Sequence, residues 1–254
     1  MYFDTHAHYD DPRFDEDREV LLGQQLPEAG ISLVVNCGCD PASSRASVAL
    51  AERYDYIYAA VGCHPQSSEE MTDADLDLYA ALTQHPKVKA IGEIGLDYHY
   101  DYPREIQLAR FEDQLRLAAD LHMPVVVHER EAHADAMALV RKYAGRVTGV
   151  FHCYSGALEQ AKELVRLGWY LGFTGAITFK NARKAPEVLE WVPLQRVFIE
   201  TDCPYMAPEP HRGHRNDSRW VPLVAARIAT LRGLEPEQVA EITRRNGMEF
   251  FHID

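Results

Sequence analysis

The stretch Met123-Pro124-Val125-Val126-Val127-His128-Glu129-Arg130 leads from apolar residues directly into polar and charged ones. A short apolar run without alternating polar positions is typical of a strand buried on both faces of a sheet. Before it, apolar residues recur at helical spacing, namely Leu108, Phe111, Leu115 and Ala118. A helix followed by a buried strand is the repeating unit of a parallel sheet.

The same alternation extends along the whole chain. Asp40-Pro41 opens one helix with an acidic N-cap and a first-turn proline, and the segment from Glu235 places Val239, Ile242 and Phe250 close to one helical face. Short β-rich runs separate most of the helix-like stretches. They lie at Tyr2–Thr5, Ile31–Cys37, Tyr56–Cys63, Val88–Ile94, Met123–His128, Val147–His152, Trp169–Thr174 and Arg196–Thr201.

Eight such strands in 254 residues predict a (β/α)8 TIM barrel that forms a single domain over residues 1–254. The competing architecture is a doubly wound open sheet, which favours fewer strands and a Gly-rich phosphate turn after the first strand. The sequence has no such turn. Pro204–Trp220 is long and irregular for a loop in a compact domain, which indicates a functional segment.

Polar side chains with metal-binding capacity stand at the ends of most of these strands. In a parallel barrel the carboxyl ends of all strands meet at one rim, where barrel active sites lie. His6 and His8 are two positions apart on a strand and therefore point to the same face. We expect a rim site holding His6, His8, Glu93, His128, His152 and Asp202, with His64 nearby. Imidazole and carboxylate together suit Zn, Mn or Fe, and Mg where carboxylates and water dominate.

The two carboxylates of this set have distinct expected roles. Glu93 lies in an otherwise apolar strand, where a carboxylate without a partner is costly. A metal removes that penalty and Glu93 can bridge two ions, whereas a salt bridge to an inward Lys or Arg is the structural alternative. Asp202 can take a proton from water as a general base. Glu200 shares its face and either orients a histidine or forms an interior salt bridge.

These residues, in this order, resemble the TatD family of metal-dependent deoxyribonucleases, a branch of the amidohydrolase-type barrels. The matching motifs are Phe3-Asp4-Thr5-His6-Ala7-His8, Gly62-Cys63-His64-Pro65, Gly92-Glu93-Ile94-Gly95-Leu96-Asp97-Tyr98, His128-Glu129-Arg130-Glu131-Ala132, Phe151-His152-Cys153-Tyr154-Ser155-Gly156, Ile177-Thr178-Phe179-Lys180-Asn181-Ala182, Glu200-Thr201-Asp202-Cys203-Pro204-Tyr205 and Arg212-Gly213-His214-Arg215-Asn216, with the late Asn246. The chain departs from the family pattern at Gln66, Cys203 and Ser218. The departures at Gln66 and Cys203, beside the site, bear on substrate preference and metal number more than on reaction type.

The resemblance implies hydrolysis of phosphodiester bonds in DNA, at strand ends or in single strands, with one to three divalent ions (Mg, Mn or Zn). It implies that His6, His8, Glu93, His128, His152 and Asp202 are metal ligands, and that His64 touches the scissile phosphate or a further ion. Candidate phosphate contacts are His64, Arg130, Lys180, Arg183 and Arg215. Candidate base-stacking residues are Tyr98, Tyr154 and Tyr205, and the structural alternatives are solvated surface for each cation and core packing for each tyrosine.

Net charge, targeting signals and cysteine content restrict the partners and the cellular compartment that we expect. Acidic residues outnumber basic ones 39 to 26, which gives a net charge of −13 and argues against a basic coat for nucleic acid. A short strand or strand end, held locally by metal and a few arginines, is compatible with it. We expect no membrane association, no secretory signal and no obligate protein partner. The five cysteines indicate a reducing, cytoplasmic environment without a disulfide framework.

Two other functions are compatible with the same ligands. One is an amidohydrolase-type enzyme that acts on a small lactam, lactone or phosphoester, because a fold does not determine a substrate. The other is a metal-binding scaffold or regulatory protein without catalysis. All six ligand-type residues are present, which weighs against the second alternative.

Overall fold

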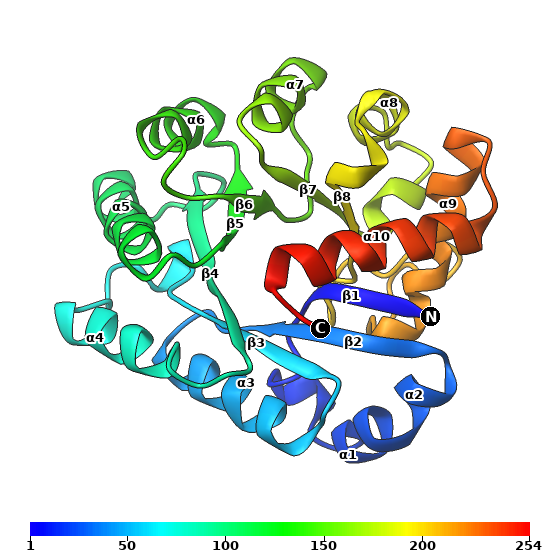
Figure 1. The fold of residues 1–254 in the computed structure, drawn as a ribbon, viewed down its shortest axis with the longest axis horizontal. Coiled ribbons are helices and arrows are strands. Elements are labelled where there is room, and N and C mark those ends of the chain that lie inside the picture. The colour runs from blue at the N-terminus through cyan, green and yellow to red at the C-terminus, as the bar shows by residue number, and fades with distance from the viewer.

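The structure is a computed structural model that describes residues 1–254. Eight parallel strands form one sheet in the order β1-β2-β3-β4-β5-β6-β7-β8 (Figure 1). The strands are β1 (Tyr2–Ala7), β2 (Ile31–Cys37), β3 (Ile57–Val61), β4 (Val88–Asp97), β5 (Val125–Arg130), β6 (Gly149–Phe151), β7 (Tyr170–Phe173) and β8 (Val197–Ile199). All eight predicted strands and the predicted TIM barrel are therefore confirmed, and the doubly wound alternative is wrong.

Helices surround the barrel on its outside, and the last of them crosses one end (Figure 1). They are α1 (Arg18–Val20), α2 (Leu26–Glu28), α3 (Pro41–Arg53), α4 (Asp73–Leu82), α5 (Arg104–Leu121), α6 (His133–Lys142), α7 (Leu158–Arg166), α8 (Lys184–Trp191), α9 (Val221–Arg232) and α10 (Pro236–Phe251). Asp40 caps α3 as predicted, because its carboxylate accepts from the Ser43 backbone N–H at 2.7 Å. The predicted irregular segment contains only a short 3-10 helix, Ser218–Trp220.

The first and last strands meet through a few contacts that close the barrel. An isolated parallel bridge pairs Ala7 with Cys203. The buried carboxylate of Asp4 accepts hydrogen bonds from the backbone N–H of Thr201 at 2.9 Å, from its hydroxyl at 2.6 Å and from the Ser218 hydroxyl at 2.5 Å. These contacts hold the end of β8, and with it Asp202, against β1.

Helix α10 covers the amino-terminal ends of the strands. The Asn246 side chain donates to the carbonyls of Leu194 and Val197, at the start of β8. The Phe251 ring lies 5.9 Å from the Phe3 ring and 6.1 Å from the Phe198 ring, centroid to centroid, inside the barrel mouth. Figure 1 shows α10 crossing this end in front of β1. The amino-terminal end is thus a packed apolar core, and the opposite end is free to carry polar groups.

Truncation of Phe251 to alanine is expected to destabilise the protein without emptying the rim site. Phe251 is completely buried, and removal of a buried phenylalanine costs about 3–5 kcal/mol of unfolding free energy. Urea denaturation followed by circular dichroism measures the loss. Trp191→Ala is the control, because Trp191 is 41 % exposed and a surface change alters stability by about 0.5 kcal/mol or less. Equal stability of the two variants would contradict the sealing role of Phe251.

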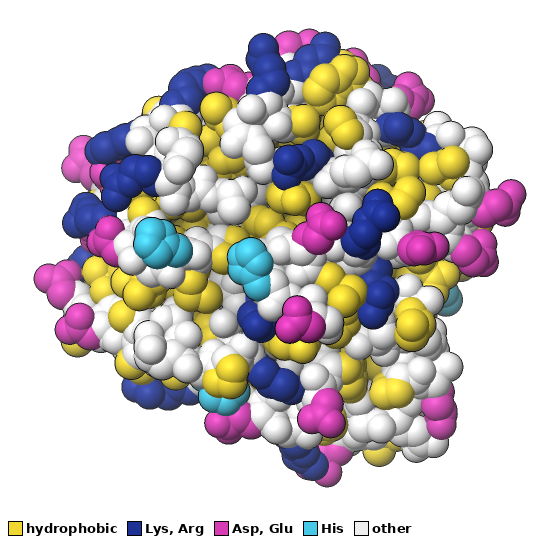
Figure 2. Space-filling view, viewed as in Figure 1, with side chains coloured by type: hydrophobic (Ala, Val, Ile, Leu, Met, Phe, Trp, Pro, Cys, Tyr) yellow, Lys and Arg dark blue, Asp and Glu magenta, His cyan; other side chains and the backbone are white.

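Charged side chains of both signs lie at the surface, as the composition predicts. Figure 2 shows the face covered by α10, on which Lys and Arg side chains are interspersed with Asp and Glu. All five cysteines are free thiols. None of the helices is both long and apolar enough to span a membrane.

Candidate metal centre

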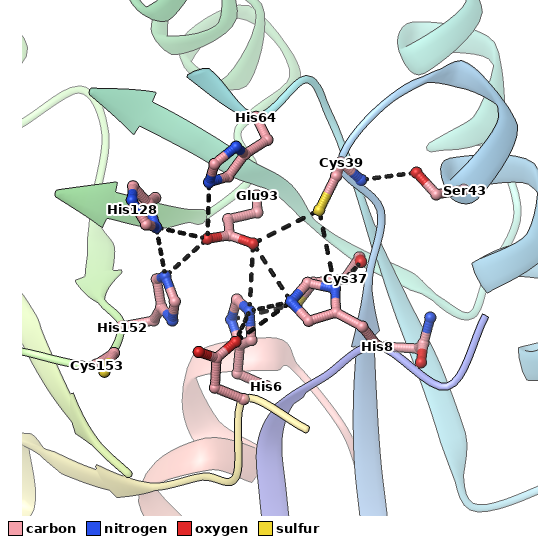
Figure 3. Close-up of polar contacts among 12 residues, drawn as sticks. His6, His8, Cys37, Cys39, Ser43, His64, Glu93, His128, His152 and Cys153 are labelled. Carbon is pink, nitrogen blue, oxygen red and sulfur yellow. Dashed lines mark hydrogen bonds and ion pairs between the residues drawn. The ribbon is translucent and has the colours of Figure 1, made fainter. Parts of the chain in front are cut away.

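The carboxyl ends of the strands bring together the side chains that the sequence singled out (Figure 3). β1 supplies His6 and, one residue past its end, His8, while β4 supplies Glu93 and β5 supplies His128. The segments that follow β3, β6 and β8 supply the remaining members, His64, His152 and Asp202. All seven have ligand-type atoms close enough to form groups that could hold a metal ion. The convergence predicted from strand ends is therefore what the structure shows.

Glu93 stands at the centre of the seven side chains. Its Oε2 lies 3.4 Å from the Nε2 atoms of both His6 and His8. Its Oε1 lies 3.0 Å from His128 Nδ1 and 2.7 Å from His152 Nε2. The two carboxylate oxygens therefore face two separate sets of imidazoles, and no Lys or Arg pairs with Glu93. The interior salt bridge considered for Glu93 is absent.

The donor chemistry on the Oε2 side fits a metal cation. His8 Nδ1 lies 2.8 Å from the Cys37 carbonyl oxygen, so this nitrogen carries the proton and Nε2 presents its lone pair. His8 Nε2 lies 3.0 Å from His6 Nε2 and 3.4 Å from Asp202 Oδ1. A bound divalent cation is the partner that satisfies a lone pair and two carboxylates at such distances.

On the Oε1 side of Glu93, an oxygen atom likewise contacts the outer nitrogen of a histidine and fixes the orientation of its ring. His128 Nε2 lies 3.2 Å from Asp97 Oδ2, which turns Nδ1 toward Glu93 and His152. His64 Nε2 lies 3.6 Å from Glu93 Oε1. Asp97, nearly fully buried, orients the His128 ring. Sequence reasoning placed Asp97 in a family motif but gave it no role; the signal was its position at the end of β4.

Glu200 occupies the place behind His152. Its Oε1 accepts a hydrogen bond from the Cys153 backbone N–H at 2.6 Å and lies 3.9 Å from His152 Nδ1. A Cβ at Gly172 would stand 2.3 Å from the Glu200 carboxylate, so only glycine leaves room for it. No Lys or Arg meets this carboxylate, so the interior salt bridge considered for Glu200 is absent. The 3.9 Å approach to His152 Nδ1, which has no hydrogen-bond partner, is its one contact with the histidines of the centre.

Protonation states differ within the cluster. Burial opposes a charge on the histidines, but their charged and hydrogen-bonding neighbours raise the pKa of His128 to about 9 and those of His8 and His152 above the usual value, so metal binding at these three would displace a proton. Burial alone raises the pKa of Glu93, but the surrounding histidines lower it well below its usual value. Burial lowers the pKa of His6 to about 4 and that of His64 to about 3. At neutral pH the central glutamate is thus a carboxylate, and these two imidazoles are neutral, as metal ligands must be.

Removal of the carboxylate behind His128 is expected to weaken metal binding. In Asp97→Ala the His128 ring loses the partner that fixes its orientation, and loss of such a partner typically lowers metal affinity about 10- to 100-fold. Calorimetric titration of the metal-free protein with Mn²⁺ or Zn²⁺ measures the change. Asp101→Ala, an exposed acid just beyond β4, is the matched control. Unchanged affinity in Asp97→Ala would show that Asp97 does not support the site.

Two connected cavities open above the cluster. One has a volume of about 490 Å³ and is lined by metal-centre residues together with Arg130, Tyr100 and Tyr205. Tyr100 is 46 % exposed and Tyr205 is 50 % exposed. The Arg130 guanidinium stacks 5.4 Å above the Tyr100 ring, and that of Arg13 lies 4.2 Å above Tyr205. The other cavity, of about 600 Å³, shares His128, His152 and Asp202 with the first.

The predicted substrate contacts divide into two groups. Arg130, Arg183 and the buried Tyr154 line the 600 Å³ cavity. Lys180 is exposed on the same loop but does not line it. Arg215 lines neither cavity; it forms hydrogen bonds of 2.7 and 2.5 Å with the Asp17 carboxylate.

The tyrosines also differ from the stacking prediction. The Tyr98 hydroxyl donates to Asp135 and its ring is covered by Arg104 at 4.4 Å, while Tyr154 is buried. Of the three predicted stacking residues only Tyr205 is exposed at the rim, with one face of its ring under Arg13. Tyr100, which the prediction omitted, is the second exposed ring, with Arg130 over one face.

Known proteins are similar to this chain over its full length. A family model described as TatD related DNase matches residues 3–252. An uncharacterized metal-dependent hydrolase, YabD of Bacillus subtilis, is 40 % identical over all of both chains. The 3'-5' ssDNA/RNA exonuclease TatD of Citrobacter koseri is 33 % identical, over 99 % of each chain. The crystal structure of the TatD homologue YjjV of Escherichia coli superimposes with a TM-score of 0.93 at 33 % identity, covering 100 % of this chain and 98 % of the other.

Proposed function

The chain belongs to the family of TatD-related DNases, which are metal-dependent hydrolases acting on ester bonds, and we propose that it cleaves phosphodiester bonds in DNA, as an exonuclease on single strands or strand ends. The observation that carries this proposal is the position of Glu93. One of its oxygens faces His6 and His8, and the other faces His128 and His152.

We assign the metal ligands from this division. His6, His8 and Asp202 would hold a divalent ion on the Oε2 side of Glu93, and His128 and His152 would hold one on the Oε1 side. Ions of this kind, when bound, lower the pKa of water from about 15.7 toward about 7 and neutralise charge on phosphate oxygens. Mg, Mn and Zn are all compatible with imidazole and carboxylate donors, in a stoichiometry of one to three per chain.

The protein side chains provide the proton transfer and the phosphate contacts. Burial raises the pKa of Asp202, but the neighbouring histidines His8, His152 and His6 together lower it below its usual value, so Asp202 is a carboxylate at neutral pH. It accepts the proton of the attacking water. His64 Nδ1 accepts from the Gln66 backbone N–H at 3.2 Å, which leaves the proton on Nε2. His64 therefore suits donation to a phosphate oxygen better than metal ligation. Arg130 offers a second, bidentate phosphate contact.

A polynucleotide is favoured by the exposed aromatic rings of the rim. Tyr100 follows β4 and Tyr205 follows β8, strands on opposite sides of an eight-stranded barrel. Both rings border the cavity above the metal centre. Bases of a single strand stack on such rings without sequence preference. A small lactone or phosphoester has no use for two rings so far apart.

Hydrolysis assays with matched substrates test the proposal. The protein is stripped with a chelator and reloaded separately with Mg²⁺, Mn²⁺ or Zn²⁺. Substrates are a single-stranded oligonucleotide labelled at either end, its duplex, bis(p-nitrophenyl) phosphate and a set of lactones. We expect metal-dependent stepwise shortening of the single strand, faster than that of the duplex. Hydrolysis of lactones alone would establish the amidohydrolase-type alternative, and metal binding without any hydrolysis would establish the scaffold.

A further inference from the structure

The cavity of about 600 Å³ has one polar wall and one apolar wall. The polar wall consists of metal-centre residues, His128, His152 and Asp202. The apolar wall lies in and beyond the loop after β7 and is built by Ala176, Ile177, Phe179, Ala182, Ala185 and Met206. The volume lies within the range of about 300–1,000 Å³ that is typical of small-molecule sites. A flat apolar ligand with one polar end fits between such walls.

The cations around this cavity have no acidic partners. Arg130, Arg183 and Lys184 line it, are exposed, and form no ion pair or side-chain hydrogen bond within the protein. Ten of the other 23 Lys and Arg side chains are paired with a carboxylate, as Arg141 is with Glu163 at 2.6 Å, whereas all three cations that line this cavity lack one. In a chain with 39 acidic and 26 basic residues, three unpaired cations around one cavity indicate a site for an anionic ligand.

The acids that reach the cavity do not cancel this charge. Glu129 is occupied by His133 and by the Ala132 backbone N–H. Asp202 faces His6 and His8. The cavity therefore combines an apolar wall, free positive charge and direct contact with the metal centre.

Resting on the proposed nuclease function, we propose that this cavity binds the terminal nucleotide of the strand, with its base against Ile177, Phe179 and Met206. Arg183 and Lys184 contact strand phosphates near that end, and the bond to be cleaved lies over His152 and Asp202. The rest of the strand leaves past Tyr100 and Arg130. A nucleotide held in this way explains action at strand ends, because the base must enter the cavity before hydrolysis.

A terminal abasic substitution tests the proposal on the wild-type, metal-loaded protein. Three oligonucleotides are compared: one unmodified, one with an abasic residue at the degraded end, and one with an abasic residue at an internal position. Loss of one stacked base typically weakens binding about 5- to 150-fold. We expect kcat/KM for removal of the first nucleotide to fall in that range for the terminal substitution and to change little for the internal one.

Variants of the cavity separate the contribution of its apolar wall to strand binding from that of its cations. Phe179→Ala is expected to reduce the discrimination between unmodified and abasic ends. Arg183→Ala combined with Lys184→Ala is expected to raise KM for the oligonucleotide and to flatten the salt dependence of log KM by about 1.4, at about 0.7 for each phosphate contact on a single strand. Arg245→Ala is the matched control, because Arg245 is an exposed, unpaired arginine on α10 at the other end of the barrel.

The possible results separate the two proposals. Equal cleavage of unmodified and abasic ends, or a normal salt dependence in the double variant, overturns the terminal-nucleotide site and leaves the nuclease function standing. Hydrolysis of bis(p-nitrophenyl) phosphate without cleavage of any oligonucleotide overturns both. The comparison of unmodified and abasic strand ends uses the wild-type protein, so it tests the terminal-nucleotide site even if Phe179→Ala fails to fold.

Discussion

Glu93→Gln is expected to lose its bound metal and nearly all hydrolytic activity while it stays folded. The substitution retains the shape of the side chain but replaces a shared carboxylate by a neutral amide. Its NH2 group would face either the Nε2 atoms of His6 and His8 or the imidazoles of His128 and His152. An imidazole lone pair that accepts a hydrogen bond from this NH2 group cannot also bind a metal ion. Loss of about 4 kcal/mol of transition-state stabilisation by the metal corresponds to about 10³-fold in rate.

Elemental analysis of the purified variant, together with hydrolysis of an oligonucleotide and of bis(p-nitrophenyl) phosphate, measures this result. Glu131→Gln is the control, since Glu131 is exposed on the segment after β5. Circular dichroism establishes that the fold is intact. A folded, metal-depleted Glu93 variant that hydrolyses DNA at the wild-type rate would show that the mechanism assigned to this centre is wrong.

Asp202→Asn is expected to lower kcat about 10²- to 10⁴-fold, the usual contribution of a positioned general base. The asparagine occupies the same volume but accepts no proton from water. The metal ligands His128 and His152 are untouched, so the variant is expected to retain metal on that side of Glu93. Hydroxide replaces the missing base as pH rises, so kcat of the variant should increase with pH over a range in which the wild-type rate is flat.

A pH–rate profile of Asp202→Asn, measured with the metal content of each sample, tests this role. Glu209 lies in the same loop and forms no side-chain hydrogen bond or ion pair, so Glu209→Gln serves as the control. If Asp202→Asn loses all its metal and shows no change in the shape of its pH profile, Asp202 is a ligand only, and the proton acceptor must be sought elsewhere in the centre.

The strands and the convergence of the seven side chains were predictable because both follow from local patterns. A strand buried on both faces is continuously apolar, and its polar end marks the rim. The extent of β4 was not predictable in this way. It continues to Asp97, three residues past the predicted end, because Gly95 lets the strand approach β5 so closely that a Cβ would lie 2.0 Å from the His128 carbonyl oxygen.

The substrate contacts were predicted less well because they depend on how loops pack. Arg215 belongs to a family motif, yet it is bound by Asp17, 198 positions away in the chain. Tyr98 and Tyr100 are two residues apart, and only packing against Asp135 and Arg104 decides that Tyr98 is covered. No local pattern in the sequence distinguishes a paired arginine or a covered ring from a free one.

The contact between Phe251 and Phe3 has a consequence for biosynthesis. The first strand of the barrel obtains its apolar partner from the final helix, α10. During translation, β1 and the histidines at its end therefore leave the ribosome long before the residues that enclose them. Until α10 emerges, the nascent chain has an unsealed barrel mouth, although Asp202, the last of the proposed metal ligands, precedes α10 in the chain. Chaperone retention of ribosome-bound chains should therefore fall when a C-terminal extension long enough to span the exit tunnel brings residue 251 outside the ribosome.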